Sequence, residues 1–315
     1  MSLETFVEAA LYAPRVGYYR RARERVGYRA QSDFYTAESL GGVFAELVVA
    51  AVETLLPPGA GAAAFTFVEL GAERGEGMLA DREHPFRAAE ARGAGEDWRL
   101  EGPCVVFSNE LFDAQPFRRF EVIEGEWREH GVRLDAGGFT AVLLPPGDAP
   151  PSPGLPPPPR EGYLYDLPSG ANALLRHLTA QPWHGLFLAF DYGLDRETLA
   201  TARPGGTART YRHHQTGGDL LAHPGETDLT HHICWDDLSG ILADAGFTAP
   251  RLESQETLFM RRARAAVERI VALGARPGVH PELQTLKELL HPHHMGRRFQ
   301  ALHAFRANNP CQPDP

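Results

Sequence analysis

Apolar residues recur along the chain at spacings that predict two kinds of element. From Glu38 to Leu55 they recur three and four positions apart, as on one face of a helix. Residues 3–11 show a shorter version of this pattern, with Ser2 placed to cap it. We therefore predict two N-terminal helices, the second of which ends at the turn at residues 57–59.

Three short, continuous apolar runs predict buried parallel strands: residues 65–70, 104–110 and 186–193. Each run ends in acidic or amide residues followed by a turn. In open α/β sheets, ligands bind beyond the carboxyl ends of the strands. The pattern therefore predicts an α/β fold with one polar crevice, lined by Glu69, Asn109, Glu110 and Asp191.

Other segments have simpler patterns. Turn spacing predicts antiparallel strands over residues 117–144, and the Pro-rich residues 144–162 predict an exposed excursion. Residues 235–245 read as a helix closed by Gly246, and residues 252–262 as a strand leading into a helix.

Composition narrows the class of partner. The chain has 315 residues and a formal charge of -10. Such acidity disfavours nucleic acid and anionic membranes, and it suits a cationic ligand or a basic protein segment. The most apolar stretch, residues 44–56, contains two glutamates and is far shorter than the ~20 residues of a membrane span. We expect no nucleic-acid partner and no membrane insertion.

Cysteine and histidine usage argues against a disulfide framework or a metal site. Cys104, Cys234 and Cys311 are scattered, and the N-terminus does not resemble a signal or transit peptide, so we expect a reducing, cytoplasmic location. Paired histidines at 213–214, 231–232 and 291–294 match no zinc spacing. We expect no metal.

The stretch FVELGAERGEGM, residues 67–78, predicts a strand, a glycine turn and the start of a helix. Backbone amides at such a helix start can face a ligand, and glycine lets the ligand approach closely. Alone, this signal is weak, because many ordinary turns share it.

The next segment, SNELFDAQPFRRF, places Asn109, Glu110 and Asp113 directly after a strand. Carboxylates at the edge of a core are costly without a partner or a function. Helix capping by Asn109 or Asp113 is the structural alternative. Similarly, Asp191 could cap a turn, and Asp228 could cap the helix near residue 235.

Several blocks then occur in the order found in MidA-like proteins: SDFYTAES, FVELGAERG, SNELFDAQPFRRF, AFDYG, YRHH, HPGETDLTHHICW and HPHHMGRRFQAL. On these blocks the chain resembles that family of S-adenosylmethionine (SAM)-dependent methyltransferases. The mitochondrial members act in assembly of respiratory complex I and methylate an arginine of one subunit. The resemblance implies a Rossmann-like fold with substrate-side insertions.

The resemblance also implies roles for individual residues. The loop from Glu69 to Gly75 would face the methionine and ribose parts of SAM, and the N-terminal segment would close over it. The implied cofactor-binding residues are Asp33, Thr36, Glu69, Gly71, Gly75 and Asn109. The implied catalytic and substrate-side residues are Glu110, Asp113, Asp191, Asp228 and His232.

An arginine acceptor fits these residue types. A guanidinium stays protonated at neutral pH and presents a fork of donors. Carboxylates such as Glu110 and Asp113 can hold that fork and take up charge as a proton leaves. Positioning would supply most of the rate of the in-line displacement. The expected partner is a protein with an exposed arginine.

Two features differ from the family pattern. Glu73 stands where the family has a second glycine, and only 34 residues separate Gly75 from Asn109, whereas one βαβ unit takes ~30. We therefore predict a shortened sheet half, with Glu90 as the candidate acid for the ribose hydroxyls. Two alternatives stay open: an assembly or interaction factor with a degenerate cofactor site and, more remotely, a metal-dependent hydrolase.

The predicted organisation has five parts: an N-terminal helical segment (1–60), the first part of the core (61–143), the Pro-rich insertion (144–162), the rest of the core with a substrate-side insertion (163–309) and a disordered tail (310–315). Helices after Phe259 could pack on the core or on a second subunit, which leaves a homodimer open.

Overall fold

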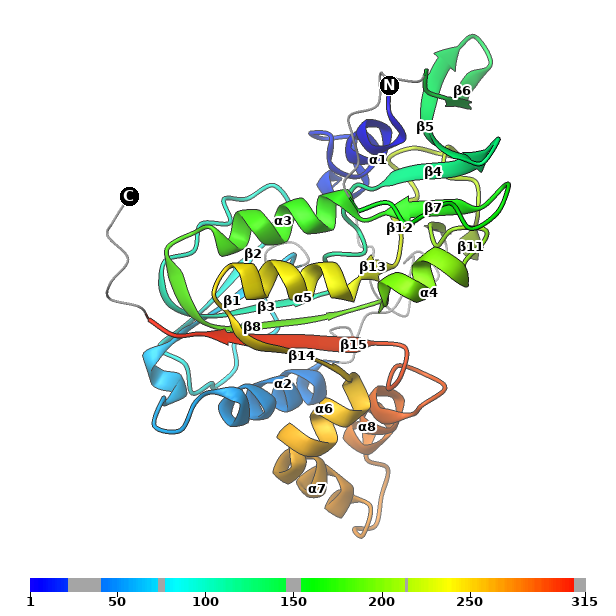
Figure 1. The fold of residues 1–315 in the computed structure, drawn as a ribbon. Coiled ribbons are helices and arrows are strands. Elements are labelled where there is room, and N and C mark those ends of the chain that lie inside the picture. Colours follow the sequence, from blue (N-terminus) through cyan, green and yellow to red (C-terminus); the bar gives the residue numbers. More distant parts are fainter. Residues whose placement is uncertain (22–40, 73–76, 146–153, 213–214, 309–315) are drawn as a thin grey trace. The chain divides into compact units, whose positions relative to one another are not determined.

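The computed structural model describes residues 1–21, 41–72, 77–145, 154–212 and 215–308 (Figure 1). The chain forms two compact units. Unit 1 comprises residues 1–35, 112–174 and 193–238, and unit 2 comprises residues 36–111, 175–192 and 239–315. The predicted segment 1–60 therefore contributes to both, because α1 (Leu3–Tyr12) lies in unit 1 and α2 (Gly42–Leu55) in unit 2.

Unit 2 is built on a six-stranded sheet of order β14-β15-β8-β3-β1-β2. Its strands are β1 (Thr66–Leu70), β2 (Ala88–Arg92), β3 (Gly102–Asn109), β8 (Trp183–Asp191), β14 (Thr248–Ser254) and β15 (Gln300–Arg306). β2, β1, β3 and β8 pair in parallel, whereas β15 and β14 join antiparallel. The predicted α/β class and its three apolar strands are confirmed.

The predicted shortening of one sheet half is also confirmed. Among the described residues, only β2 lies beyond β1, and it is an edge strand. Glu90 is paired in register with Val68 on β1, and its carboxylate forms an ion pair with Arg92 at 2.5 Å. The candidate ribose acid therefore lies on β2, already engaged by a cation.

The helix predicted after the glycine turn is wrong for the described residues 77–87, which form turns and bends. This stretch contains only Met78, Leu79 and Phe86 as buried apolar residues, and Pro85 interrupts it. Such a segment has no apolar stripe long enough to stabilise a helix. Instead, α2 supplies the helix that packs against the β1 and β3 side chains Phe67 and Phe107.

The core of unit 2 joins α2 to three later helices, which Figure 1 shows on the same side of the sheet. They are α6 (Gln255–Arg262), α7 (Arg264–Leu273) and α8 (Pro281–Leu290). Phe190 stacks on Phe259 at 5.4 Å and meets Phe44 edge-on at 5.7 Å. The helices after Phe259 thus pack on the core of their own chain.

Two helix boundaries test the predicted pattern. α2 begins at Gly42 rather than Glu38, because Gly41 has a φ of 73° and cannot continue a helix. The strand-to-helix prediction for residues 252–262 is confirmed, since the Ser254 hydroxyl caps α6 by accepting a hydrogen bond from Thr257 N–H.

Unit 1 contains the predicted antiparallel strands, in the order β6-β5-β4-β7. They are β4 (Arg118–Ile123), β5 (Glu126–Asp135), β6 (Gly138–Leu143) and β7 (Leu164–Leu167). α1 packs on them through Phe6 and Val7, and Ser2 caps it as predicted. A second small sheet, β11-β10-β12, comprises Gln215–Gly217, Arg209–Arg212 and Asp228–Thr230.

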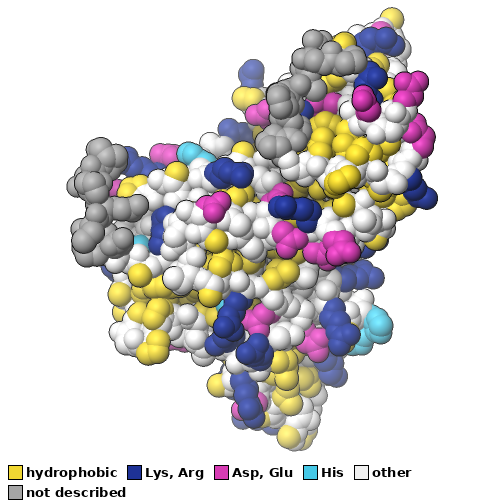
Figure 2. Space-filling view, in the orientation of Figure 1, with side chains coloured by type: hydrophobic (Ala, Val, Ile, Leu, Met, Phe, Trp, Pro, Cys, Tyr) yellow, Lys and Arg dark blue, Asp and Glu magenta, His cyan; other side chains and the backbone are white. Residues whose placement is uncertain are grey.

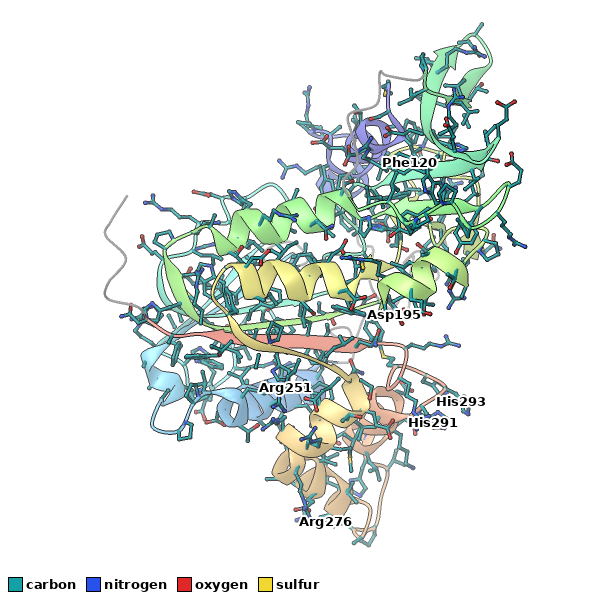
Figure 3. All side chains as sticks on the ribbon, in the orientation of Figure 1. Phe120, Asp195, Arg251, Arg276, His291 and His293 are labelled. Atoms are coloured by element: carbon teal, nitrogen blue, oxygen red, sulfur yellow. The ribbon has the colours of Figure 1, made fainter. Side chains whose placement is uncertain are left out.

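The remaining elements are short or span both units. Unit 1 holds η1 (Tyr18–Arg20) and the parallel pair β9 (Gly193–Leu194) and β13 (Ile233–Cys234). It also holds α4 (Arg196–Thr201), which Asp195 caps (Figure 3). In unit 2, η3 (Ala62–Ala64) precedes β1. The later residues of α3 (Ser169–Thr179) and α5 (Trp235–Asp244) belong to unit 2, on the face of its sheet opposite α2 (Figure 1). Gly246, with a φ of 83°, ends α5 as predicted.

The described part of the Pro-rich segment, residues 154–162, has no helix or strand and is largely exposed. On the face drawn in Figure 2, acidic and basic side chains are interspersed. No helix in the described ranges is both long and apolar enough to span a membrane.

Candidate functional site

The parallel register of unit 2 gathers predicted site residues at one edge of the sheet. Leu70 pairs with Ser108, and Asn109 pairs with Phe190, so β1, β3 and β8 end side by side. Gly71 follows β1, Glu110 follows β3, and Asp191 is the last residue of β8. The predicted alignment of polar strand ends is therefore present within unit 2.

Glu69 and Gly71 shape the end of β1. The Glu69 side chain is buried, and its Oε2 accepts a hydrogen bond of 2.7 Å from Met78 N–H. Gly71 has a φ of 82°, and its N–H donates to the Arg92 carbonyl at 2.8 Å. A Cβ at Gly71 would lie 3.0 Å from Leu111 Cδ1. Both backbone conformation and space therefore favour glycine at this turn.

Asn109 and Glu110 form the corresponding turn after β3. Asn109 Nδ2 donates to Glu110 Oε1 at 3.2 Å, while the buried Asn109 Oδ1 accepts no hydrogen bond from any described residue. Glu110 has a φ of 51°, and its N–H donates to the Phe190 carbonyl at 2.9 Å. A left-handed non-glycine residue costs roughly 1–2 kcal/mol, and such strain is concentrated at functional sites.

Asp191 closes β8 and is fully buried. Its Oδ1 accepts a hydrogen bond of 2.8 Å from Tyr192 N–H, which is the turn-capping contact that the sequence allowed. The Tyr192 ring packs on Phe299 at 4.2 Å. Asp191 thus stabilises the strand end at the same edge as Asn109.

Two further predicted acids, Asp113 and Asp228, lie together in unit 1. Both are buried, at 4% and 3% exposure. The Asp113 carbonyl accepts a hydrogen bond of 3.0 Å from His231 N–H, which ties the two segments together. Burial raises the pKa of Tyr12, and the charges of Asp228 and Asp113 raise it further. The charges of both carboxylates therefore raise the pKa of the same tyrosine.

Sequence reasoning missed the tyrosines of this cluster. Tyr19 OH donates to Asp228 Oδ1 at 2.8 Å, and the rings of Tyr12 and Tyr19 stack at 5.4 Å. The available signal was the Tyr- and Arg-rich segment after α1, which is typical of a binding surface. No pattern within that segment links it to an acid more than 200 residues away.

His232 lies in different surroundings. Its N–H donates to Thr207 Oγ1 at 3.1 Å. Burial lowers the His232 pKa to about 4, and the charges of Arg209 and Arg203 lower it further. The imidazole is therefore neutral at pH 7. His232 directly follows His231, whose N–H donates to the Asp113 carbonyl.

Of the remaining sequence candidates, some lie in turns and others lie outside the described residues. The rings of His291 and His293 lie 5.7 Å apart in the turns after α8 (Figure 3). Within the described ranges, no group of three or more His, Cys, Asp or Glu residues could hold a metal ion. Asp33, Thr36, Glu73 and Gly75 lie outside the described residues.

A parallel sheet with polar strand ends is typical of α/β proteins that bind a ligand at that edge. Residues 89–252, just over half of the chain, match the family described as "Putative S-adenosyl-L-methionine-dependent methyltransferase". The chain belongs to this family. It is a SAM-dependent methyltransferase, and SAM is its cofactor.

Solved structures agree with this assignment. A "likely methyl transferase" from Burkholderia thailandensis, bound to S-adenosyl-homocysteine, is 25% identical, with a TM-score of 0.83 over 97% of this chain and 88% of that chain. An uncharacterised protein from the same organism is 23% identical, with a TM-score of 0.77 over 97% and 87% of the two chains, and it supports the fold. No curated protein sequence matches significantly.

The strand-end residues fit such a cofactor. The methionine part of SAM carries an ammonium group and the ribose carries hydroxyls, so an acceptor is needed in the site. Asn109 Oδ1 is a buried acceptor that no described residue uses. A buried polar atom normally has a partner, and a ligand donor would supply one. Gly71 is exposed and carries no side chain that would cover the backbone at this edge.

Proposed function

We propose that this methyltransferase transfers the methyl group of SAM to an arginine side chain of a protein substrate. The observation that carries the proposal is that Asp113 and Asp228, both buried in unit 1, lie on segments joined by the His231–Asp113 backbone hydrogen bond and by the stacked rings of Tyr12 and Tyr19. Cations and hydrogen-bond donors stabilise buried carboxylates, and a guanidinium supplies both.

The acids and rings of unit 1 match a guanidinium in shape as well as in charge. A carboxylate can accept two parallel N–H donors from the planar fork, and an aromatic face can stack on it. As the nitrogen gains a methyl group, it must lose a proton, which a carboxylate can accept directly or through water. Asp113 and Asp228 would orient the nitrogen and take up that charge.

In unit 2, we propose that the strand-end residues Glu69, Gly71 and Asn109 hold the cofactor, with the predicted catalytic acid Glu110 beside Asn109. SAM supplies an activated methyl group on a sulfonium. Asn109 Oδ1 would accept a hydrogen bond from the cofactor, and Asp191 would keep the adjacent strand end in place. The relative that contains S-adenosyl-homocysteine supports the choice of SAM as the cofactor. Asp33, Thr36, Gly75 and His232 remain predicted members of the site.

The direct test is to identify the methylated atom. We would incubate the purified protein with methyl-labelled SAM and an arginine-containing basic peptide, or the same peptide with every arginine changed to lysine. Cell-extract proteins would serve as a second substrate set, and mass spectrometry would locate the label. The proposal expects methylarginine in the arginine-containing peptide and in the cell-extract proteins, and no label in the lysine-substituted peptide. Label on lysine, or on small molecules alone, would contradict it.

A second candidate, a non-catalytic assembly or interaction factor, is favoured by two features of the described residues: only one strand lies beyond β1, and Glu69 accepts a hydrogen bond from Met78 N–H. It predicts that the cofactor site is degenerate. Calorimetry with SAM and S-adenosyl-homocysteine distinguishes the two. Absence of binding by either ligand at millimolar concentration would favour this candidate, and binding by both would favour the enzyme.

A further inference from the structure

The two acids of unit 1 come from distant segments of the chain. Asp113 follows β3, and Asp228 begins β12. For two carboxylates to hold one guanidinium, their separation must be fixed within a fraction of an ångström. Aspartate has few rotatable bonds, so the contacts of its neighbours decide how well it is held.

Tyr12 and Tyr19 connect these two segments. The Tyr12 hydroxyl donates to the Ala114 carbonyl at 3.0 Å and accepts a hydrogen bond of 3.2 Å from Gln115 Nε2, directly after Asp113. The Tyr12 ring stacks on Tyr19 with an interplanar angle of 20°. At the other end, Tyr19 OH donates to Asp228 Oδ1 at 2.8 Å.

We propose that Tyr12 and Tyr19 are positioning residues, and that Tyr19 fixes the Asp228 carboxylate relative to Asp113 for acceptor methylation. This inference rests on the proposed function and adds to it residues that were not among the sequence predictions. Tyr18 meets the Tyr19 ring edge-on at 5.0 Å and is itself fully buried, which limits movement of Tyr19. Burial raises the pKa of Tyr19, so its hydroxyl keeps the proton that it donates.

A double-mutant cycle tests the inference. Tyr19→Phe keeps the ring and removes the hydroxyl, and Asp228→Asn removes the charge that the hydroxyl orients. We expect Tyr19→Phe to lower kcat/KM for the acceptor peptide by about 10- to 100-fold. In the Asp228→Asn background the same change should have little further effect, because Tyr19 acts through Asp228. Affinity for S-adenosyl-homocysteine should stay within about twofold in all variants.

The matched control is Tyr163→Phe. Tyr163 is also a buried tyrosine of unit 1, and its hydroxyl donates to the Leu199 carbonyl at 2.8 Å. The effect of Tyr163→Phe on kcat/KM should be the same whether residue 228 is aspartate or asparagine. Tyr12→Phe, which removes the contacts at residues 114 and 115, should lower kcat/KM in the same direction as Tyr19→Phe.

Unchanged kcat/KM in Tyr19→Phe would overturn the inference, as would effects of Tyr19→Phe and Asp228→Asn that simply multiply. Thermal unfolding of each variant separates positioning from folding. If Tyr19→Phe acted only by destabilising the fold, its effects on the unfolding midpoint and on kcat/KM would resemble those of the Tyr163→Phe control. Absence of methyl transfer by the wild-type protein would contradict the proposed function itself. In that case, failure of Tyr19→Phe to change the thermal unfolding midpoint when Asp228 is present would still overturn the Tyr19–Asp228 coupling.

Discussion

The two units bury charge in different ways. In unit 2, the buried carboxylates Glu69 and Asp191 lie at strand ends and accept hydrogen bonds from backbone N–H groups. In unit 1, buried carboxylates also meet side chains: Asp228 accepts from Tyr19, and Asp166 pairs with Arg119 in addition to two backbone N–H groups. Backbone placement follows from sheet topology, whereas side-chain placement depends on a few specific partners. Single substitutions should therefore affect unit 1 more strongly.

The largest effect is expected at Asp228. Asp228→Asn retains the shape of the side chain and removes the charge that would take up the acceptor's proton. We expect methyl transfer to fall by roughly 10²- to 10⁴-fold, the usual range for loss of an acid–base group. Initial rates with methyl-labelled SAM would measure it. A loss below threefold would remove Asp228 from the mechanism.

The next largest effect concerns the buried ion pair of unit 1. Arg119 Nε donates to Asp166 Oδ1 at 2.7 Å, and Asp166 Oδ2 also accepts hydrogen bonds from the N–H groups of Thr207 and Ala208. Arg119→Met would leave the carboxylate without its cation, at a cost of about 3–5 kcal/mol in unfolding free energy. Denaturant unfolding would measure the change.

The control for this prediction is an exposed pair in unit 2. Arg264 Nε lies 2.7 Å from Glu268 Oε1, and both side chains are largely exposed. Arg264→Met should change stability little, because solvent screens such pairs. Equal effects of the two substitutions would show that burial does not set the cost of breaking the Arg119–Asp166 pair.

Acidification should weaken unit 1 through a buried histidine. Burial lowers the His231 pKa to about 4, against about 6.5 in an unfolded chain. Between these values the unfolded state binds more protons, so stability is present above pH 6.5 and is lost as pH falls toward 4. The loss approaches roughly 3 kcal/mol. Thermal unfolding at pH 7, 6 and 5 would reveal it.

Substitution of His231 isolates this effect. His231→Leu removes the titrating group and should flatten the dependence of unfolding on pH in this window. His293→Leu, at an exposed position of unit 2, should leave the dependence unchanged. An unaltered slope in His231→Leu would show that other groups control the acid sensitivity.

The smallest effect is expected at Gly71. Alanine at a φ of 82° is strained, and its Cβ would meet Leu111 at 3.0 Å. Gly71→Ala should cost about 1–2 kcal/mol of stability, measurable as a lower unfolding midpoint, and should weaken binding of S-adenosyl-homocysteine. Gly218→Ala provides the control, because Gly218 is exposed and a Cβ there would meet no described atom within 4 Å. Equal effects at both glycines would mean that the β1 turn is not constrained.

Sequence patterns predicted the fold wherever burial dominates. The apolar runs of β1, β3 and β8 and the cap of α1 follow from local residues alone. β2 could not be predicted in this way. Its sequence, AAEAR, has no strand-like apolar pattern, and it forms because the edge of β1 offers unpaired backbone groups.

The site was predictable only in part, for a related physical reason. Strand-end residues such as Asn109 follow from topology, because parallel strands end at one edge. The described residues 77–87 form turns and bends rather than the predicted helix, so a glycine turn does not by itself determine the next element of the chain. Contacts such as Tyr19 with Asp228 join residues far apart in sequence, and local pattern carries no signal for them.

The measurement that tests the central claim most directly is calorimetric titration of S-adenosyl-homocysteine into the wild-type protein, Asn109→Ala and Asp228→Asn, with methyl transfer assayed in parallel. The proposed function has unit 2 bind the cofactor and unit 1 bind the acceptor. Asn109→Ala should therefore weaken ligand binding by about tenfold, whereas Asp228→Asn should bind normally and fail to transfer. Normal binding by Asn109→Ala together with weakened binding by Asp228→Asn would contradict the assignment.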